Sequence, residues 1–274
     1  MERIGLIAGN RRFPIVFAQA ARKARQPVVA IAIKGETSRQ LARLVEKVYW
    51  LSLKDFDRLF DIFQSEGITR VVMAGQISPF RLFSREVRES RSLQKLLAAM
   101  KDRKANTIFS SIAGQMEKAG IQLIDSTTFL QDQIPGVGVL TRRQPTAEEW
   151  ADVRFGYELA KKIADLDIGL TIGVKNKAVV GVEALEGTDN LIRRAGRIAR
   201  GNLVVIKVGR TGQDMRFDIP VVGLQTVKTL VKAGASCLAM ESGTTLILDR
   251  QEVIRLADAR GIALVAVKAV NKNP

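Results

Sequence analysis

The hydrophobic and polar positions of this 274-residue chain alternate between short apolar runs and longer amphipathic stretches. The apolar runs of the first half are residues 3–9, 27–33, 48–51, 70–75 and 121–124. The stretches with helical spacing between them are residues 15–24, 37–46, 55–66 and 84–117. Strands that alternate with helices predict a parallel, doubly wound sheet, whose ligand crevice lies beyond the carboxyl ends of the strands.

The pattern changes after residues 133–145, the stretch richest in proline and glycine, which we predict to be a linker. Thr146 and Glu149 then predict a capping box at the start of a helix. The hairpin pattern that follows predicts a mixed sheet. The fold class is therefore α/β, with a Rossmann-like N-terminal domain at residues 1–132 and a mixed α+β C-terminal domain at 146–274.

Composition restricts the chemistry that the chain can perform. Hydrophobic residues make up 46% and charged residues 26%, and no apolar run reaches the roughly 18 residues of a membrane span, so we expect a soluble cytoplasmic protein. The single cysteine, Cys237, is more simply explained as a buried thiol than as a nucleophile. Because the chain has no histidine, acid–base or metal chemistry must rest on Asp and Glu.

Net charge is +15, and arginine and lysine gather at residues 81–104 and 193–210. This balance suits an anionic partner such as a phosphorylated ligand, a membrane surface or nucleic acid, although solvated helix faces explain it equally well. Aromatic residues make up only 5% and do not interleave with the second basic cluster, so no nucleic-acid partner is expected.

The segment 213–220 combines two carboxylates with basic neighbours. The spacing of Asp214 and Asp218 would place them on the same side of a strand, although Asp218 could instead be a turn residue. Lys207, Arg210 and Arg216 lie nearby in sequence, and such a group suits a phosphate ester. The spacing leaves open whether Asp218 binds a metal or orients water.

A second acidic group, Glu183, Glu186 and Asp189, spans a strand end, a turn and a helix start. Oxygen ligands at such a junction could hold Mg²⁺ or Mn²⁺. The alternative places Asp189 in the first helical turn as a favourable charge and Glu186 in a solvated loop.

Residues 5–9 resemble half of a dinucleotide-binding fingerprint, without its third glycine. A glycine at a strand end lets backbone amides approach a phosphate, but a plain turn glycine is an equal alternative.

Taken together, segments over almost the whole chain resemble the UDP-2,3-diacylglucosamine pyrophosphatase family of lipid A biosynthesis, the LpxI type. The matching segments are residues 5–9 with Pro14, 74–75 through 78–79, 167–169, 182–194, 213–223 and 231–234. The Glu-Gly-Thr-Asp sequence at 186–189 and the Asp-Ile-Pro sequence at 218–220 are the most specific of them.

The resemblance implies a two-domain hydrolase, in which residues 1–132 bind the sugar nucleotide and residues 146–274 form the catalytic domain. Such an enzyme cleaves the pyrophosphate of UDP-2,3-diacylglucosamine to UMP and 2,3-diacylglucosamine 1-phosphate, lipid X, with Mg²⁺ or Mn²⁺. Asp218 matches the family's essential aspartate. The expected metal-binding residues are Asp218, Glu183, Glu186 and Asp189. The expected substrate-binding residues are Gly9, Asn10, Gly75, Gln76, Ser78, Thr188, Lys207, Gln213 and Arg216. Where the family often has a glycine triplet, this chain has Asn10 and Arg11, which could supply donors to the phosphates or sugar.

A lipid-linked UDP-sugar substrate would favour peripheral contact of the basic surface with the cytoplasmic face of the inner membrane. The resemblance also implies a possible homodimer. Phe80, Leu82 and Phe83 could line an acyl pocket, although packing in the core is the more common role. The main alternative is a non-catalytic sugar-nucleotide-binding or regulatory protein of the same fold, and a nucleic-acid-binding protein is the least favoured reading.

Overall fold

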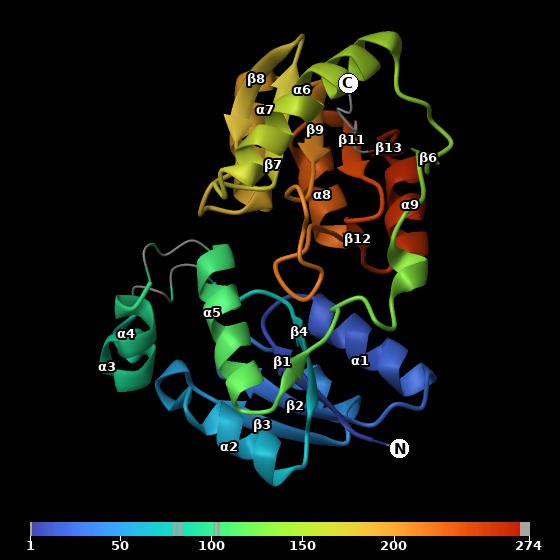
Figure 1. Ribbon diagram of the computed structural model, residues 1–274. Coiled ribbons are helices and arrows are strands. Elements are labelled where there is room, and N and C mark those ends of the chain that lie inside the picture. The colour runs from blue at the N-terminus through green and yellow to red at the C-terminus, as the bar shows by residue number, and fades with distance from the viewer. Residues whose placement is uncertain (1, 79–80, 82–83, 101, 103–104, 269–274) are drawn as a thin grey trace. The chain divides into compact units, whose positions relative to one another are not determined.

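The computed structural model describes residues 2–78, 81, 84–100, 102 and 105–268. The chain forms two compact units. Unit 1 contains Met1–Gln131 together with the short segment Asp214–Asp218, and unit 2 contains Asp132–Gln213 and Ile219–Pro274. Figure 1 shows both units with their elements labelled. The expected combination of a parallel-sheet domain and a mixed α+β domain is confirmed.

Unit 1 is built on a five-stranded parallel sheet in the order β3-β2-β1-β4-β5. Its strands are β1 (Ile4–Ala8), β2 (Val28–Ile33), β3 (Lys47–Leu51), β4 (Arg70–Ala74) and β5 (Gln122–Leu123). Its helices are α1 (Phe13–Lys23), α2 (Arg58–Ser65), α3 (Arg85–Glu89), α4 (Arg91–Ala98) and α5 (Ala105–Lys118), with 3₁₀ turns η1 (Arg39–Arg43) and η2 (Leu53–Asp55). The strand order reverses direction between β1 and β4, which makes that point the place where a doubly wound sheet opens a crevice.

The two faces of the unit 1 sheet are covered by different helices. Strands β1 and β2 are wholly buried and β4 is largely so, as expected for a parallel sheet covered on both sides. Side chains of β1, β2 and β4 pack with those of α2 and α5 in one hydrophobic cluster. Right-handed crossovers place α1 on the opposite face.

Two predicted helices of unit 1 differ from expectation. Residues 37–46 form only η1, where Leu41 is the one buried side chain, so too little apolar surface is available to hold a full helix. The stretch 84–117 is divided into α3, α4 and α5. Ser90 has an extended backbone that ends α3, and its hydroxyl accepts a hydrogen bond from the Leu93 N–H at the start of α4.

Unit 2 is built on a six-stranded mixed sheet in the order β6-β13-β11-β9-β7-β8. The sheet strands are β6 (Gly138–Val139), β7 (Thr171–Lys175), β8 (Ala178–Val182), β9 (Leu203–Lys207), β11 (Ala235–Glu241) and β13 (Ala263–Val267). The helices are α6 (Ala147–Asp165), α7 (Thr188–Ala199), α8 (Leu224–Lys232) and α9 (Arg250–Ala259), preceded by the 3₁₀ turn η4 (Gln131–Gln133). The strands β10 (Val221–Val222) and β12 (Leu246–Ile247) form a separate parallel pair. Strands β9, β11 and β13 run parallel, and β6, β7 and β8 pair antiparallel with their neighbours.

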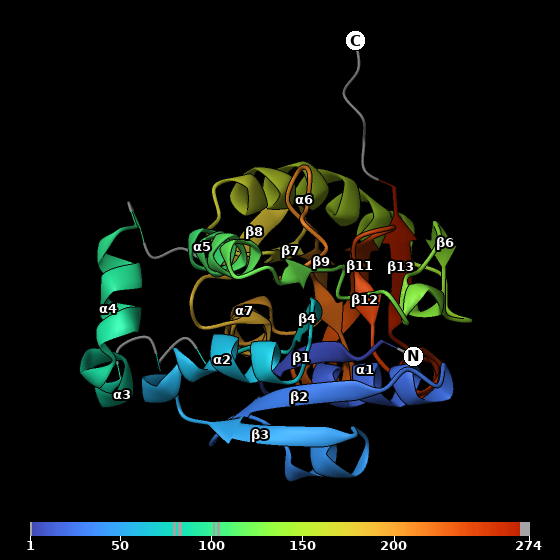
Figure 2. The same cartoon turned by 60° about the horizontal axis from the view of Figure 1, so that its bottom comes forward.

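This sheet is the middle of three layers. Successive residues of β9 and β11 alternate between two hydrophobic clusters, because side chains alternate across a strand. Helices α7, α8 and α9 supply one cluster and α6 supplies the other. Figure 2, a rotated view, separates α6 from α7 on either side of the strands. The capping box predicted for Thr146 and Glu149 is present at the start of α6.

The segment 133–145, predicted to be a linker, contributes β6 to the unit 2 sheet, where Val139 pairs with Val265. The proline and glycine residues that suggested a linker therefore surround a short edge strand, a position that tolerates them.

The segment Asp214–Asp218 lies within the predicted C-terminal domain, 146–274, but packs with the other unit. It was assigned to the C-terminal domain by its place in the sequence, but it belongs to unit 1. The residue proposed to be essential, Asp218, is therefore presented by the N-terminal unit.

Among the residues that the structure describes, no helix has the length and apolar character needed to cross a membrane.

Candidate functional site

The carboxyl edge of the unit 1 sheet brings together the predicted glycines. The Gly9 N–H donates to the Ala74 carbonyl at 2.9 Å, and the Asn10 N–H donates to the Gln76 carbonyl at 2.7 Å. A Cβ on Gly9 would lie 2.6 Å from the Gln76 carbonyl oxygen, and Gly75 has φ +86°. Both glycines are therefore needed for the close approach of the β1 and β4 loops, at the reversal point of the strand order.

Beside this contact lies a carboxylate that the sequence analysis missed. Glu36 follows β2, and its Oε2 accepts a 2.5 Å hydrogen bond from Asn10 Nδ2. The guanidinium of Arg81 lies 3.7 Å from the other oxygen of Glu36. The available signal was position: an acidic residue placed just after a buried parallel strand emerges at the same edge as the residues after β1 and β4.

The remaining predicted residues of this edge have simpler surroundings. The Gln76 side chain is exposed, and the carbonyl of Ser78 accepts the Arg81 N–H at 2.9 Å. Phe80, Leu82 and Phe83, for which packing in the core was favoured over an acyl pocket, lie outside the described residues.

The segment Asp214–Asp218 is anchored to unit 1 by its backbone and by one aromatic ring. The Ser126 N–H donates to the Met215 carbonyl at 2.9 Å, and the Ser126 hydroxyl lies 2.6 Å from the Arg216 carbonyl. Phe217 is 3% exposed, joins the cluster of α2 and α5, and stacks on Phe109 with ring centroids 5.6 Å apart. The ring acts as an apolar anchor for the segment.

The expectation that Asp214 and Asp218 share one side of a strand is wrong, because the segment is a turn. Asp218 has φ +50°, in the left-handed region. Non-glycine residues adopt that region uncommonly, Asp and Asn more often than the others, and such residues cluster at functional sites. Phe217, the residue before Asp218, is buried, and its ring constrains the backbone of this turn.

Asp214 and Arg216 form a tight pair within this segment. Arg216 Nη2 lies 2.8 Å from Asp214 Oδ2, and Nη1 lies 3.3 Å from Glu117. The hydrogen bonds from Arg216 hold the pKa of Asp214 below its ordinary value, and Asp214 in turn raises the pKa of Arg216. Arg216 therefore already has two carboxylate partners, which weakens its expected role as a phosphate-neutralising group.

Unit 2 contains a buried polar cluster around a lysine. Lys207, at the end of β9, is 4% exposed, and its ammonium donates to Thr171 at 3.1 Å and to Thr188 at 2.9 Å. The Thr188 hydroxyl donates to Glu183 Oε1 at 2.8 Å, while Glu183 Oε2 is buried and has no hydrogen-bond partner. A buried ammonium is costly unless it is compensated, so Glu183 balances Lys207 through the threonine between them.

Helix α7 and two glycines set the position of this cluster. Thr188 is the first residue of α7 and follows Gly187, whose φ is +81°. A Cβ on Gly169 would lie 2.1 Å from the Glu183 carbonyl oxygen, so only glycine permits the backbones to approach there. The positive end of the α7 dipole and the Lys207 ammonium favour an anion at the same end of the helix.

The predicted metal ligands of unit 2 do not form a metal-binding cage. Glu186 pairs with Arg194 at 2.6 Å, and Asp189 is buried in the first turn of α7. Within the described part of the chain, no group of three or more acidic or cysteine side chains is placed to hold one ion. Because the Lys207 ammonium already supplies the positive charge near Glu183, these residues do not fit a metal ion held by the protein alone.

The stem that leads into Asp214–Asp218 is fastened to unit 2. The Gly209 N–H donates to Glu241 Oε2 at 2.7 Å, and Lys161 Nζ donates to the Gly209 carbonyl at 2.7 Å. Gln213 Oε1 accepts from the Arg210 N–H at 3.1 Å, which closes the turn before Asp214. The predicted Gln213 thus has a structural role.

Glu241 was not predicted from the sequence, although it ends a buried parallel strand. It is 3% exposed, and Lys161 and Tyr157 also donate to it. Burial raises the pKa of Tyr157, which keeps its phenol protonated as a donor. The network secures the place from which the loop leaves unit 2.

Cys237 is buried, and burial raises the pKa of its thiol to about 12. A thiol in that state is almost wholly protonated at neutral pH and is inert as a nucleophile.

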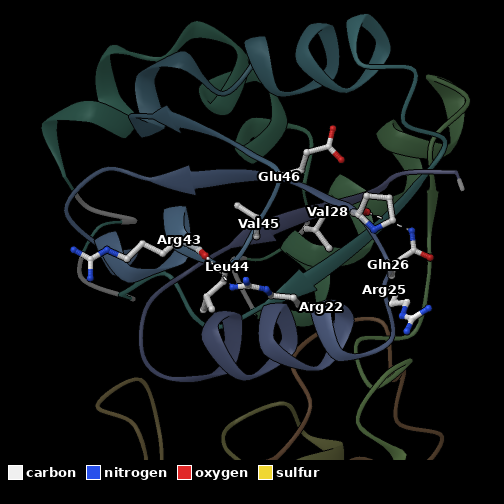
Figure 3. A pocket seen from close by; sticks show the side chains of 9 residues that line it. Arg22, Arg25, Gln26, Val28, Arg43, Leu44, Val45 and Glu46 are labelled. Carbon is white, nitrogen blue, oxygen red and sulfur yellow. Dashed lines mark hydrogen bonds between the residues drawn. The ribbon is translucent and has the colours of Figure 1, made fainter.

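A cavity of about 350 Å³ lies elsewhere on unit 1, near the start of β2. Figure 3 shows Arg22, Arg43 and Glu46 among the side chains that line it. Arg22 donates to the Arg43 carbonyl at 3.4 Å. Because the cavity adjoins the amino ends of strands and contains none of the predicted site residues, we do not assign the candidate site to it.

Both halves of the chain match the same family. Residues 3–133 match the model of the LpxI N-terminal domain, and residues 136–265 match that of the LpxI C-terminal domain. The chain carries the two domains of the LpxI family. The resemblance stated from the sequence is thereby supported at the level of the family.

The chain is similar to a UDP-2,3-diacylglucosamine pyrophosphatase LpxI from Caulobacter vibrioides: the two are 27% identical over 277 residues, which cover 97% of this chain and 98% of that protein. Its name supports a hydrolase, in agreement with the expected enzyme class. The bifunctional purine biosynthesis protein PurH from Bacillus subtilis is 27% identical over 187 residues, or 64% of this chain and 33% of PurH.

Among solved structures, the region aligned with a UDP-glucose-4-epimerase from Stenotrophomonas maltophila covers 44% of this chain and 35% of the epimerase chain, with 15% identity and a TM-score of 0.28. The biotin carboxylase subunit of a pyruvate carboxylase covers 73% and 42%, with 14% identity and a TM-score of 0.29. These scores are too low to support an argument about function.

Proposed function

We propose that this protein hydrolyses UDP-2,3-diacylglucosamine. One water molecule would cleave the pyrophosphate bond and release UMP and 2,3-diacylglucosamine 1-phosphate, the product known as lipid X. The observation that carries the proposal is the near full-length similarity to the Caulobacter protein of that name. The separate matches to both LpxI domains support it.

Lys207 and Thr188 are the proposed phosphate-binding groups of unit 2. The lysine brings a buried positive charge, and Thr188 stands at the amino end of α7, where backbone N–H groups and the helix dipole favour an anion. In a site with few waters, a fixed cation stabilises charge that develops on phosphate oxygens far better than it would in bulk water.

Asp218 is the proposed essential carboxylate. The Phe217 ring and the Ser126 hydrogen bonds hold its segment, and this anchoring would keep the carboxylate in one place before substrate arrives. Pre-positioning of this kind lowers the entropic part of a barrier. Both candidate roles, binding a metal and orienting water, remain within the proposal.

We further propose dependence on Mg²⁺ or Mn²⁺, which would offset the negative charge of the pyrophosphate. Since the described residues contain no group of three acidic side chains that could hold the ion, it would bind through the substrate phosphates and one or two carboxylates, as Mg²⁺ commonly does. Activity should then be abolished by excess EDTA and restored by added Mg²⁺, and full activity in EDTA would contradict this part of the proposal.

A location in the cytoplasm with peripheral contact at the inner membrane, and a homodimer, also belong to the proposal. The net charge of +15 and a substrate with acyl chains support membrane contact. Co-sedimentation with anionic but not with zwitterionic vesicles would support it, and sedimentation velocity would test the dimer.

The decisive test of the activity is incubation of the purified chain with UDP-2,3-diacylglucosamine and Mg²⁺ or Mn²⁺, with UDP-GlcNAc as the non-acylated control. We expect UMP release from the diacylated substrate only. Equal hydrolysis of both would indicate a general nucleotide-sugar pyrophosphatase. Thermal stabilisation by the substrate without turnover would favour the non-catalytic alternative.

A further inference from the structure

Three loops of unit 1 meet where the strand order reverses, and they contain a polar group with a distinct chemical preference. Asn10 follows β1, Glu36 follows β2 and Gln76 follows β4. Asn10 contacts both of the others, through its backbone N–H to Gln76 and through its side-chain amide to Glu36. In a parallel sheet this edge is the usual ligand-binding edge.

The Glu36 carboxylate is almost buried but only partly satisfied. Its side chain is 8% exposed, with one hydrogen bond from Asn10 at 2.5 Å and one longer ion pair to Arg81 at 3.7 Å. Arg81 is shared, because it also donates to the Lys34 carbonyl at 2.7 Å and to Glu86 at 2.6 Å. A carboxylate accepts about four hydrogen bonds, so Glu36 has capacity for further donors.

Asn10 adds a second acceptor to the same place. Its NH₂ group is used by Glu36, and its Oδ1 is buried with no hydrogen-bond partner. Turning the amide over would place its oxygen against the Glu36 carboxylate, so the present orientation is the favourable one. The pair therefore requires donors, and a phosphate, which brings negative charge and no strong donor, does not fit. The sequence predicts Asn10 as a donor to the phosphates or the sugar, whereas the atom that has no partner in the structure is the acceptor Oδ1.

We propose that Glu36 and Asn10 form a subsite for the vicinal hydroxyl groups of a ribose. This inference rests on the proposed function, because the substrate named there decides between two sugars. The glucosamine carries acyl groups at positions 2 and 3, so the vicinal diol of the substrate belongs to the ribose of UMP. An acidic side chain after the second strand that accepts from ribose hydroxyls is a recurrent device of nucleotide-binding parallel sheets.

The experiment measures binding of UMP and of 2′-deoxy-UMP to the full chain by isothermal titration calorimetry. A hydrogen bond to a charged carboxylate predicts that the wild-type chain binds UMP about 10-fold or more tightly than 2′-deoxy-UMP. Glu36→Gln should reduce this ratio to about 2 or less, mainly by weakening UMP. Glu46→Gln is the matched control, since Glu46 is exposed and lies before β3, and the ratio should be unchanged.

Equal affinity of the wild-type chain for UMP and 2′-deoxy-UMP would overturn the proposal without any variant, as would a full ratio retained in Glu36→Gln. Hydrolysis of the lipid substrate combined with equal affinities would overturn the subsite but leave the proposed function intact. A preserved preference for UMP over 2′-deoxy-UMP, without hydrolysis of the lipid substrate, would support the subsite and overturn the proposed function. Failure of the wild-type chain to bind UMP at all would count against both.

Discussion

Truncation of the Phe217 ring should release the segment that presents Asp218. The ring is 3% exposed and stacks on Phe109, and Phe→Ala changes at such positions cost roughly 3–5 kcal/mol. The rest of the anchoring consists of the Ser126 hydrogen bonds, each with a net value of about 1 kcal/mol. With about 1.4 kcal/mol per factor of ten, a loss of 3 kcal/mol raises the undocked fraction roughly 100-fold.

Limited digestion with trypsin reports this release directly, because Arg216 lies within the segment and is half-buried in its pairs with Asp214 and Glu117. When opening is fast relative to cleavage, the rate of cleavage follows the population of the open state. In Phe217→Ala, cleavage after Arg216 should accelerate roughly 100-fold relative to cleavage at Lys118, the last residue of α5.

Phe155→Ala provides the control, because Phe155 is 38% exposed on α6. It should leave cleavage after Arg216 unchanged. The reasoning is refuted if Phe217→Ala accelerates cleavage after Arg216 and after Lys118 equally, because that pattern means that unit 1 unfolds as a whole and the ring is not a local anchor.

Three further predictions concern unit 2. Lys207→Met should lower the rate of hydrolysis by roughly 100- to 1,000-fold, because a buried cation at the phosphate would be lost. A loss in rate below about 3-fold, in a variant with an unchanged circular dichroism spectrum, would contradict this role. Gly169→Ala should clearly lower the urea midpoint of unfolding, because the new Cβ would lie 2.1 Å from a carbonyl oxygen. Gly114→Ala, in open space on α5, is the control and should leave the midpoint unchanged or raise it. Equal midpoints for the two variants would refute the steric argument. Burial raises the pKa of Glu149, but hydrogen bonds, the first of them from Arg143, outweigh burial and hold this pKa below the ordinary 4.5. The ionised carboxylate therefore stabilises the fold above about pH 4.5, and this contribution is lost as the pH falls. Glu149→Gln should therefore be less stable than the wild type at pH 7 and should lose less of its stability between pH 5 and pH 3, as measured by urea denaturation; parallel pH profiles would contradict this.

Local patterns in the sequence were sufficient to predict much of the fold. The buried strands of unit 1 are continuous apolar runs, and the capping box of Thr146 and Glu149 marks the start of α6 by side-chain chemistry alone. The helix predicted for residues 37–46 does not form, because helical spacing without enough buried side chains does not stabilise a helix.

The candidate site was predicted less completely, because it depends on contacts between distant residues. Nothing near Phe217 in the sequence indicates that its ring enters the core formed by α2 and α5, so the segment Asp214–Asp218 was assigned to the wrong unit. Glu36 was overlooked because its role emerges only when the ends of β1, β2 and β4 are adjacent. Lys207 and Thr188 were both predicted, but their bridge to Glu183 depends on the pairing of β7 with β9.

The most direct test of the central claim is UMP release from UDP-2,3-diacylglucosamine by Asp218→Asn, measured beside the wild type and Asp57→Asn. Asp57 is exposed and makes no capping hydrogen bond at the start of α2, so its variant should retain full activity. We predict that Asp218→Asn folds normally and loses at least 100-fold in rate. Wild-type rates in a folded Asp218→Asn variant would contradict the assignment of the essential carboxylate.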